Sequence, residues 1–249
     1  MSDLVLRART PVEILDAAVT LFRRHAAQYI TVAAAIVVPF AVLQLMVGAP
    51  DPTGESVDIG AQLLNLVVTF IGYALTSAAV TVLGAAAYRG EPLDPRGALR
   101  AALPAAPRVI AATVAQWLLI VVGFFGLIIG GFWVTAMTFA LLPAIVLERR
   151  GVSAAFSRSA ALSRGRKRHI LATIFLGGLA YAGVAIVVSL AGLFTRNAVF
   201  TLLLTTLVQL VAYPIFALVY TVLYYDSRIR LEGYDLEVLE RSLAPVAAP

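Results

Sequence analysis

The sequence predicts an all-α, polytopic membrane protein with six transmembrane helices in three hairpins, each preceded by an amphipathic surface helix on the cytoplasmic side. Three observations lead to this prediction. The chain of 249 residues is 61% hydrophobic and only 13% charged, about half the charged content of roughly 25% that is usual in soluble domains. Its apolar residues form long uncharged tracts. Arginines gather in alternate gaps between the expected spans, as in proteins that follow the positive-inside rule.

The first long apolar tract begins only near Ala26, after a stretch that carries both acids and arginines. A stretch of this kind does not have the charge pattern of a secretory signal, and a tract of about 23 residues is too long for the apolar part of a signal peptide. We therefore expect an uncleaved first span. Residues 1–249 are expected to form one integral membrane domain.

Tract lengths predict the number of spans, because each span needs roughly 20 residues. The uncharged tract at 109–147 is long enough for two spans joined at the glycine-rich segment 123–131, and only Arg196 and Asn197 separate the last two spans. Two alternatives stay open: a re-entrant segment over 109–147, and one broken helix around 192–197. The six predicted spans cover residues 26–48, 60–88, 107–125, 129–148, 169–192 and 197–225.

The cations assign an orientation to these spans. Of the 19 Lys and Arg residues, 18 fall on one side of the six-span arrangement, and only Arg196 falls on the opposite side. This bias predicts that both termini lie in the cytoplasm. The cations are almost all arginine, with Lys167 the only lysine, and alanine is abundant. This composition is weakly indicative of a GC-rich bacterial genome, so we expect a bacterial inner-membrane protein.

The segment RSAALSRGRKRHI at 158–170 carries several cations and no acid. A nucleic-acid patch is one interpretation, but every predicted cytoplasmic loop has a similar excess of arginine. We therefore expect contacts with anionic lipid head groups, at about 1 kcal/mol for each cation, and no nucleic-acid partner. The predicted head-group contacts are Arg23, Arg24, Arg149, Arg150, Arg158, Arg164, Arg166, Lys167 and Arg168.

Three short segments before the odd-numbered spans have the pattern of surface helices. Thr10, Pro11 and Glu13 form a capping box with proline at the first helical position. Asp94 and Pro95 repeat this start. A third helix is expected after Gly151, with its apolar residues on one face.

Polar residues within the spans are few and uncharged. No Asp, Glu, Lys, Arg or His lies deep in a predicted span, which argues against an ion-coupled carrier or an intramembrane hydrolase. Two interpretations of the remaining amides stay open. They line a polar substrate path, or they form hydrogen bonds between helices, which is the interpretation that we favour. The candidate path residues are Gln62, Asn65, Gln116 and Gln209.

Pro39, Pro143 and Pro214 each interrupt an apolar tract. A proline there removes a backbone hydrogen bond and kinks the helix. The kinks serve either as a gate or lipid-facing cleft, or only as fixed curvature. Gly126 and Gly130 have the spacing of a close-packing motif, although their position favours a turn. His25 and His169 have no patterned ligands near them, so no metal site is expected.

The segment 226–249 is predicted to be a cytoplasmic tail. Its part at 226–243 has more acids than cations. It either docks a protein partner or tethers the chain to the membrane surface. The preceding Tyr220, Tyr224 and Tyr225 are expected to form an aromatic belt at the membrane interface.

Three stretches carry a resemblance to a known family: RTPVEILDAAVTLFRRHAAQYI at 9–30, LLPAIVLERRGVSAAFSRSAALSRGRKRHIL at 141–171 and YYDSRIRLEGYDLEVL at 224–239. They resemble the six-span membrane domain of bacterial glycerophosphodiester phosphodiesterases and its stand-alone uncharacterised relatives. The resemblance implies the six-span fold over nearly the whole chain. In the fused enzymes catalysis belongs to a separate soluble barrel, which this chain lacks, so the resemblance transfers no catalytic residue.

The function expected from these observations is that of a non-enzymatic scaffold or accessory subunit of a membrane complex, without a cofactor, metal or catalytic residue. Its partners would be anionic lipids and a protein bound through the cytoplasmic face or the tail at 226–243. The alternative is a transporter or lipid-translocating permease, which the hairpin repeats and intramembrane prolines motivate. A central polar cavity lined by Gln62, Asn65, Gln116 or Gln209 would favour the alternative, and a dry bundle would count against it.

Overall fold

The computed structural model describes residues 7–47, 59–126 and 128–236, and every regular element within these ranges is a helix. The all-α prediction is therefore confirmed for this part of the chain. The elements in chain order are α1 (Pro11–Arg24), α2 (Ala26–Val47), α3 (Ile59–Arg89), α4 (Pro95–Ala102), η1 (Leu103–Ala105), α5 (Ala106–Gly126), α6 (Ile128–Met137), α7 (Leu141–Val146), α8 (Val152–Leu162), α9 (Lys167–Thr195) and α10 (Ala198–Glu232).

Six helical segments are long and apolar enough to cross a membrane: Ala26–Met46, Ile59–Arg89, Pro95–Gly126, Ile129–Val146, Lys167–Thr195 and Ala198–Glu232. Large apolar side chains on them stand outward, with Phe125 89%, Phe194 83% and Leu118 61% exposed. A soluble monomer rarely presents a large apolar surface to water. The length, composition and outward apolar surface of these helices are those of a multi-pass membrane protein.

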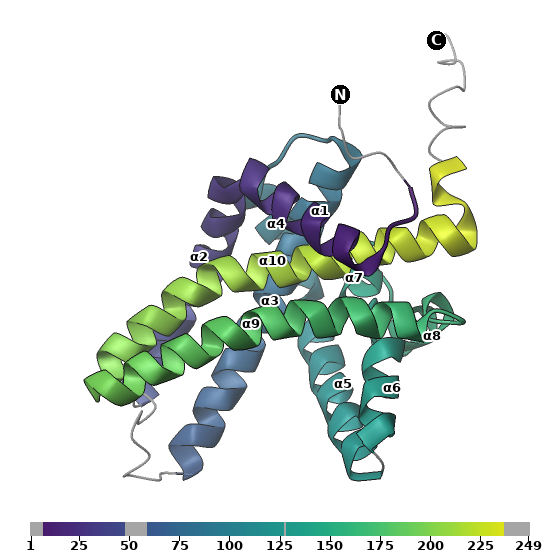
Figure 1. Ribbon diagram of the computed structural model, residues 1–249. Coiled ribbons are helices and arrows are strands. Elements are labelled where there is room, and N and C mark those ends of the chain that lie inside the picture. The colour runs from purple at the N-terminus through teal and green to yellow at the C-terminus, as the bar shows by residue number, and fades with distance from the viewer. Residues whose placement is uncertain (1–6, 48–58, 127, 237–249) are drawn as a thin grey trace.

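Helix α3 lies at the centre of the packing because its residues are small where other helices approach it. Ala74, Ala78 and Ala79 are almost fully buried, and α3 contacts α2, α5, α7 and α10. Figure 1 shows α9 and α10 side by side, crossing the α5–α6 pair at a steep angle rather than lying parallel to it. Helix α6 contacts α9 at this crossing, and α3 packs against both α10 and α5.

The three short helices α1, α4 and α8 begin as the sequence predicts. Thr10 and Glu13 form the capping box of α1, and Asp94 caps α4 with Pro95 at the first position. Helix α8 follows Gly151. The buried face of α1 packs on α10 and α9, and that of α4 packs on α3. These apolar faces are therefore part of the protein core.

The fourth predicted span is broken. Helix α6 ends at Met137, a turn follows, and α7 begins at Leu141. The backbone N–H of Ala140 in this turn donates to Ser159 Oγ of α8 at 2.9 Å, so this N–H has a buried acceptor outside its own helix. Pro143 lies in the first turn of α7, where a backbone N–H would have no helical acceptor. Pro39 and Pro214 instead lie inside α2 and α10, which continue through them.

Helices α5 and α6 touch backbone to backbone at two glycines. An added Cβ on Gly130 would lie 2.6 Å from the carbonyl oxygen of Gly123, whereas one on Gly126 would meet nothing within 4 Å. The close approach therefore involves Gly123 and Gly130 rather than the Gly126–Gly130 pair that the sequence indicated. Only a residue without Cβ permits such a backbone contact.

Gly130→Ala is expected to lower the free energy of unfolding by about 1–3 kcal/mol, as overpacking of a tight contact does. The carbonyl of Gly123 belongs to a helix backbone and cannot rotate away. Thermal unfolding of the purified protein in detergent measures the change. Gly126→Ala is the matched control and should be neutral or slightly stabilising, since alanine favours the helix. Equal losses in both variants would contradict the assigned contact.

Candidate functional site

The predicted head-group cations divide into two groups. Arg23, Arg24, Arg149, Arg164 and Arg168 are exposed. Arg158, Arg166 and Lys167 are partly buried and contact other side chains, as does the exposed Arg150. Together with Arg9 and Arg89, the second group gathers the ends of α3, α7, α9 and α10 with the N-terminal segment and α8, and we call this part of the bundle the basic end. The ends of α9 and α10 that belong to it, and α8, lie on the right-hand side of Figure 1.

Glu148 organises one half of the basic end. Arg158 Nε donates to both of its carboxylate oxygens at 2.8 and 3.0 Å, and the Tyr224 hydroxyl donates to Oε1 at 2.8 Å. Arg150 Nε also donates to Oε2, at 2.5 Å. The two terminal nitrogens of Arg158 donate to the carboxylate of Glu232 on α10. Its side chain is only 16% exposed, so its guanidinium is held between two acids of the protein.

Several donors determine the charge state of Glu148. Burial alone would raise the pKa of this carboxyl, but the hydrogen bonds from Arg158, Arg150 and Tyr224 outweigh burial and hold the pKa below its ordinary value. The carboxylate is therefore ionised at neutral pH. It acts as a fixed negative centre between α7, α8 and α10.

Asp226 organises the other half, and its side chain is fully buried. Its Oδ1 accepts the backbone N–H of Arg9 at 2.7 Å, and its Oδ2 accepts from Arg166 at 2.6 Å. Arg230 approaches Oδ1 at 3.3 Å and also donates to the carbonyl of Arg9 at 2.8 Å. His169 Nε2 lies 3.5 Å from Oδ2. Asp226 thus joins the N-terminal segment to α9 and α10.

Aromatic side chains fill the space around these charges. Tyr88 and Tyr225 stack with ring centroids 4.6 Å apart, and the hydroxyl of Tyr88 accepts from Arg9 at 2.9 Å. Tyr224 and Tyr225 are only 1% and 2% exposed. These two tyrosines are therefore part of the core, and the expectation of an interfacial belt is wrong for them. Lys167 places its ammonium 3.5 Å from the centroid of the Trp133 ring, a cation–π geometry.

The four candidate path residues do not come together. Gln62 is exposed, and Asn65 donates to Ala61 of its own helix at 3.1 Å. Gln209 lies on α10 and does not line the polar cavity described below. Gln116 alone lines that cavity, where its Nε2 donates to the Thr138 hydroxyl at 2.9 Å.

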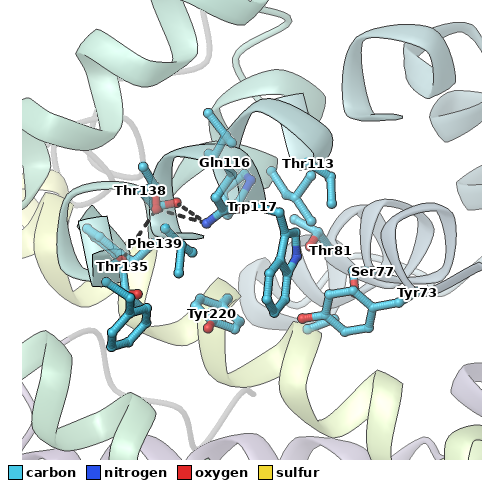
Figure 2. A pocket seen from close by; sticks show the side chains of 16 residues that line it. Tyr73, Ser77, Thr81, Thr113, Gln116, Trp117, Thr135, Thr138, Phe139 and Tyr220 are labelled. Carbon is cyan, nitrogen blue, oxygen red and sulfur yellow. Dashed lines mark hydrogen bonds between the residues drawn. The ribbon is translucent and has the colours of Figure 1, made fainter. Parts of the chain in front are cut away.

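The cavity has a volume of about 320 Å³ and lies between α3, α5, α6, α7 and α10. Figure 2 shows Gln116 and Thr138 paired on one side, with Trp117 and Tyr73 on the other. Pro143 of α7 also lines it, so the break in the fourth span borders the cavity. Its polar side chains are Tyr73, Ser77, Thr81, Thr113, Gln116, Thr135, Thr138 and Tyr220.

Two of the cavity hydroxyls, those of Ser77 and Thr113, make no hydrogen bond of ordinary geometry within the described part of the chain. Ser77 is 1% exposed and Thr113 is 5% exposed, and the Tyr73 hydroxyl lies beside that of Ser77. By contrast, Thr135 donates to the carbonyl of Gly131 four residues earlier at 2.9 Å. A buried hydroxyl without a partner costs about 1–3 kcal/mol, so these two side chains leave binding capacity in the cavity.

The lining of the cavity suits binding rather than reaction. Its residues include no Asp, Glu, His, Lys or Arg, so no general base lies beside the hydroxyls. Within the described ranges no group of three or more acids and histidines is placed to hold a metal ion. The cavity can offer hydroxyl donors and acceptors to an uncharged polar group.

Sequence reasoning missed three features of these sites. The hydroxyl residues Tyr73, Ser77 and Thr81 recur every four residues on α3, and this spacing places them on one helix face. Glu148 and Asp226 each stand at the end of an apolar tract beside arginines. An acid at that position could have been examined as an internal partner of those arginines. The pairing itself could not be predicted from local patterns, because it joins residues far apart in the chain.

Comparison with protein-family models, with curated proteins and with solved structures found no match.

Glu148→Gln is expected to lower the free energy of unfolding by roughly 1–3 kcal/mol at pH 7, because charge-assisted hydrogen bonds become neutral ones. The folded pKa of Glu148 is lowered, so its stabilisation is present above the ordinary carboxyl pKa of about 4.3. It is lost as the pH falls through the folded value. Melting curves of both proteins between pH 7 and pH 3 should therefore converge at the acid end.

Glu91→Gln provides the control for this experiment. Glu91 pairs with Arg89 at 2.6 Å, but its side chain is 49% exposed. Exposed pairs contribute about 0–1 kcal/mol. A Glu91→Gln loss as large as that of Glu148→Gln would contradict the central position of Glu148.

Proposed function

We propose that this protein is a non-enzymatic, multi-pass protein of the bacterial inner membrane, with both termini in the cytoplasm, that acts as a scaffold or accessory subunit. Its basic end would face the cytoplasm and contact anionic lipid. The observation that carries the proposal is the division of the arginines at the basic end. Some neutralise buried acids and brace the bundle, while others remain exposed for head groups.

The six apolar helices and the distribution of cations support the placement in the membrane. Every described cation except Arg196 lies on the same side of the six-span arrangement. Such a bias is typical of cytoplasmic loops and supports the proposed orientation. Helix α2 packs on α3, α5 on α6, and α9 on α10. These contacts support three hairpins, each following one of the short helices α1, α4 and α8.

The braced geometry of the basic end supports a scaffold role. Asp226 and Glu148 connect elements from both ends of the chain through Arg9, Arg166 and Arg158. Paired and hydrogen-bonded charges hold their elements in one arrangement. A surface held in this way suits the binding of a partner without rearrangement.

The last part of the described chain supports a partner-binding surface. Helix α10 continues past residue 225 to Glu232, so the first part of the predicted tail is a helix end. Leu231 and Leu236 are 47% and 64% exposed there. Exposed leucines beside charged side chains form the kind of patch that a protein partner covers. The predicted tail residues 237–243 lie outside the described residues.

A second candidate function is that of a transporter or lipid-translocating permease. The cavity favours it, because a polar space bordered by a broken helix recurs at substrate sites of membrane transporters. The relationship to the membrane domain of glycerophosphodiester phosphodiesterases stays a proposal that rests on the three sequence stretches alone.

Charge reversal of Arg164 and Arg168 tests the lipid contacts of the basic end. Both side chains are exposed, so Arg164→Glu/Arg168→Glu should leave the fold intact while reducing co-purified anionic lipid. With about 1 kcal/mol for each cation, the reduction should be severalfold or more. Native mass spectrometry of gently extracted protein measures both retained lipid and any retained protein partner.

Arg196→Glu is the control, because it makes the same kind of charge change at the opposite end of the spans. It should leave anionic lipid retention at the wild-type level. Unchanged lipid and partner retention in the double variant would overturn the assignment of the basic end. Arg166 is left intact in this experiment, since its loss would remove the shortest ion-pair partner of the buried Asp226 and destabilise the fold.

A further inference from the structure

The polar cavity adjoins two apolar grooves, with each of which it shares lining residues. The first lies between α3 and α5, has a volume of about 360 Å³, and shares Thr113 and Trp117 with the cavity. The second lies between α5, α6 and α9, also has a volume of about 360 Å³, and shares Phe124 and Thr135 with it. A polar space thus has an apolar groove beside it on two of its edges.

The grooves lie on the surface that faces outward from the bundle. Leu66, Val114 and Leu118 of the first groove are 52%, 53% and 61% exposed. In the second, Phe175 is 65% exposed. On a membrane-spanning bundle such side chains meet lipid chains, so an acyl chain can enter either groove directly from the bilayer.

The position of the cavity restricts the charge of its ligand. Thr81 and Tyr73 lie about 12 Å and 24 Å from Arg89 along α3, at 1.5 Å per residue. Arg89 belongs to the basic end, where it donates to the Tyr225 hydroxyl. The cavity therefore lies at hydrocarbon depth, where a charged group without a partner is expensive. None of its lining residues carries a charge, so a phosphate would have no counter-ion.

The unpaired hydroxyls of Ser77 and Thr113 identify what the ligand must supply. A serine or threonine in a helix usually satisfies its hydroxyl on the carbonyl four residues earlier, as Thr69, Thr135 and Thr221 do here. Ser77 and Thr113 do not. Their hydroxyls can donate to ester or hydroxyl oxygens of a bound molecule.

We propose that the cavity binds the glycerol and ester groups of an uncharged two-chain lipid with a free hydroxyl, a diacylglycerol, with one acyl chain in each adjoining groove. Ser77 and Thr113 donate to its oxygens, and Trp117 and Phe124 border the exits of the chains. This site goes beyond the scaffold role and names a ligand class for the second candidate function. It does not depend on the head-group contacts of the basic end.

The test uses the full chain in a neutral detergent with added dioleoylglycerol. Wild-type protein should show a saturable rise in melting temperature and retain close to one equivalent of the lipid after gel filtration. Ser77→Ala/Thr113→Val should weaken the apparent affinity about tenfold, since it removes two hydrogen bonds. The nearly isosteric Thr113→Val alone should weaken it about threefold, which keeps the test valid if the double variant is unstable.

Thr76→Val is the matched control. Thr76 also lies on α3, is fully buried and has an unpaired hydroxyl, but it does not line the cavity. This variant should bind dioleoylglycerol like the wild type. An equal loss of affinity in Thr76→Val and Thr113→Val would overturn the site, because it would show a general packing effect.

Competition with dioleoyl phosphatidylglycerol tests whether the cavity recognises the uncharged glycerol group or only the acyl chains. This lipid has the same acyl chains with a charged head, and a tenfold excess should not displace dioleoylglycerol. Displacement, or binding of dioleoylglycerol without saturation, would overturn the proposal. Arg164→Glu/Arg168→Glu should bind dioleoylglycerol normally, so failure of the cavity site is distinguishable from failure of the basic-end contacts.

Discussion

The packing of this protein depends on one buried carboxylate, that of Asp226. Its side chain has no exposed surface, and an ionised carboxylate removed from water must be compensated at close range. Arg166 and the backbone N–H of Arg9 provide this compensation. Moving α9 or the N-terminal segment away would remove one of these partners and leave the buried carboxylate with fewer hydrogen bonds, since Arg230 of the same helix is its other close cation. The position of these elements is therefore restricted far more strongly than apolar packing alone would restrict it.

The same arrangement separates two environments along the bundle. At the basic end, charges are concentrated and paired, and stacked tyrosines fill the space between them. Further into the bundle the lining of the cavity is polar but uncharged. The proposed lipid contacts follow this division. A phosphate head group would meet arginine only at the basic end, and a neutral hydroxyl-bearing group would meet hydroxyls in the cavity.

Sequence patterns predicted the parts of this structure that are determined locally. Tract length identified the six apolar helices, and the residues around Thr10 and Asp94 identified two helix starts, because both depend on neighbours within a few positions. The break at 138–140 was not foreseen, since its compensation comes from Ser159 of another helix. For a similar reason, the sequence did not predict which arginines pair with acids inside the protein and which are exposed. Arg158 and Arg166 look like their exposed neighbours in sequence, and only tertiary contacts with Glu148 and Asp226 distinguish them.

Sequence patterns had the same limit at the candidate site, where tertiary contacts decide which polar residues line the cavity. Gln116 was among the expected polar residues and does line the cavity, while Gln62, Asn65 and Gln209 do not. Amides attract attention in an apolar tract because they are rare. Serine and threonine are common there and usually bond to their own helix. Whether a hydroxyl such as that of Thr113 is free for a ligand depends on its rotamer, which the sequence does not contain.

The contact between Arg9 and Asp226 joins residues 217 positions apart, and this separation has a consequence for biosynthesis. At about 5–20 residues per second, Asp226 is synthesised roughly 10–40 s after Arg9. Helix α1 therefore leaves the ribosome long before its docking surface on α10 exists. Until the last helix is inserted, its apolar face must rest on lipid or on a chaperone. Docking of α1 on α10 can therefore occur only after this last helix of the bundle has been made.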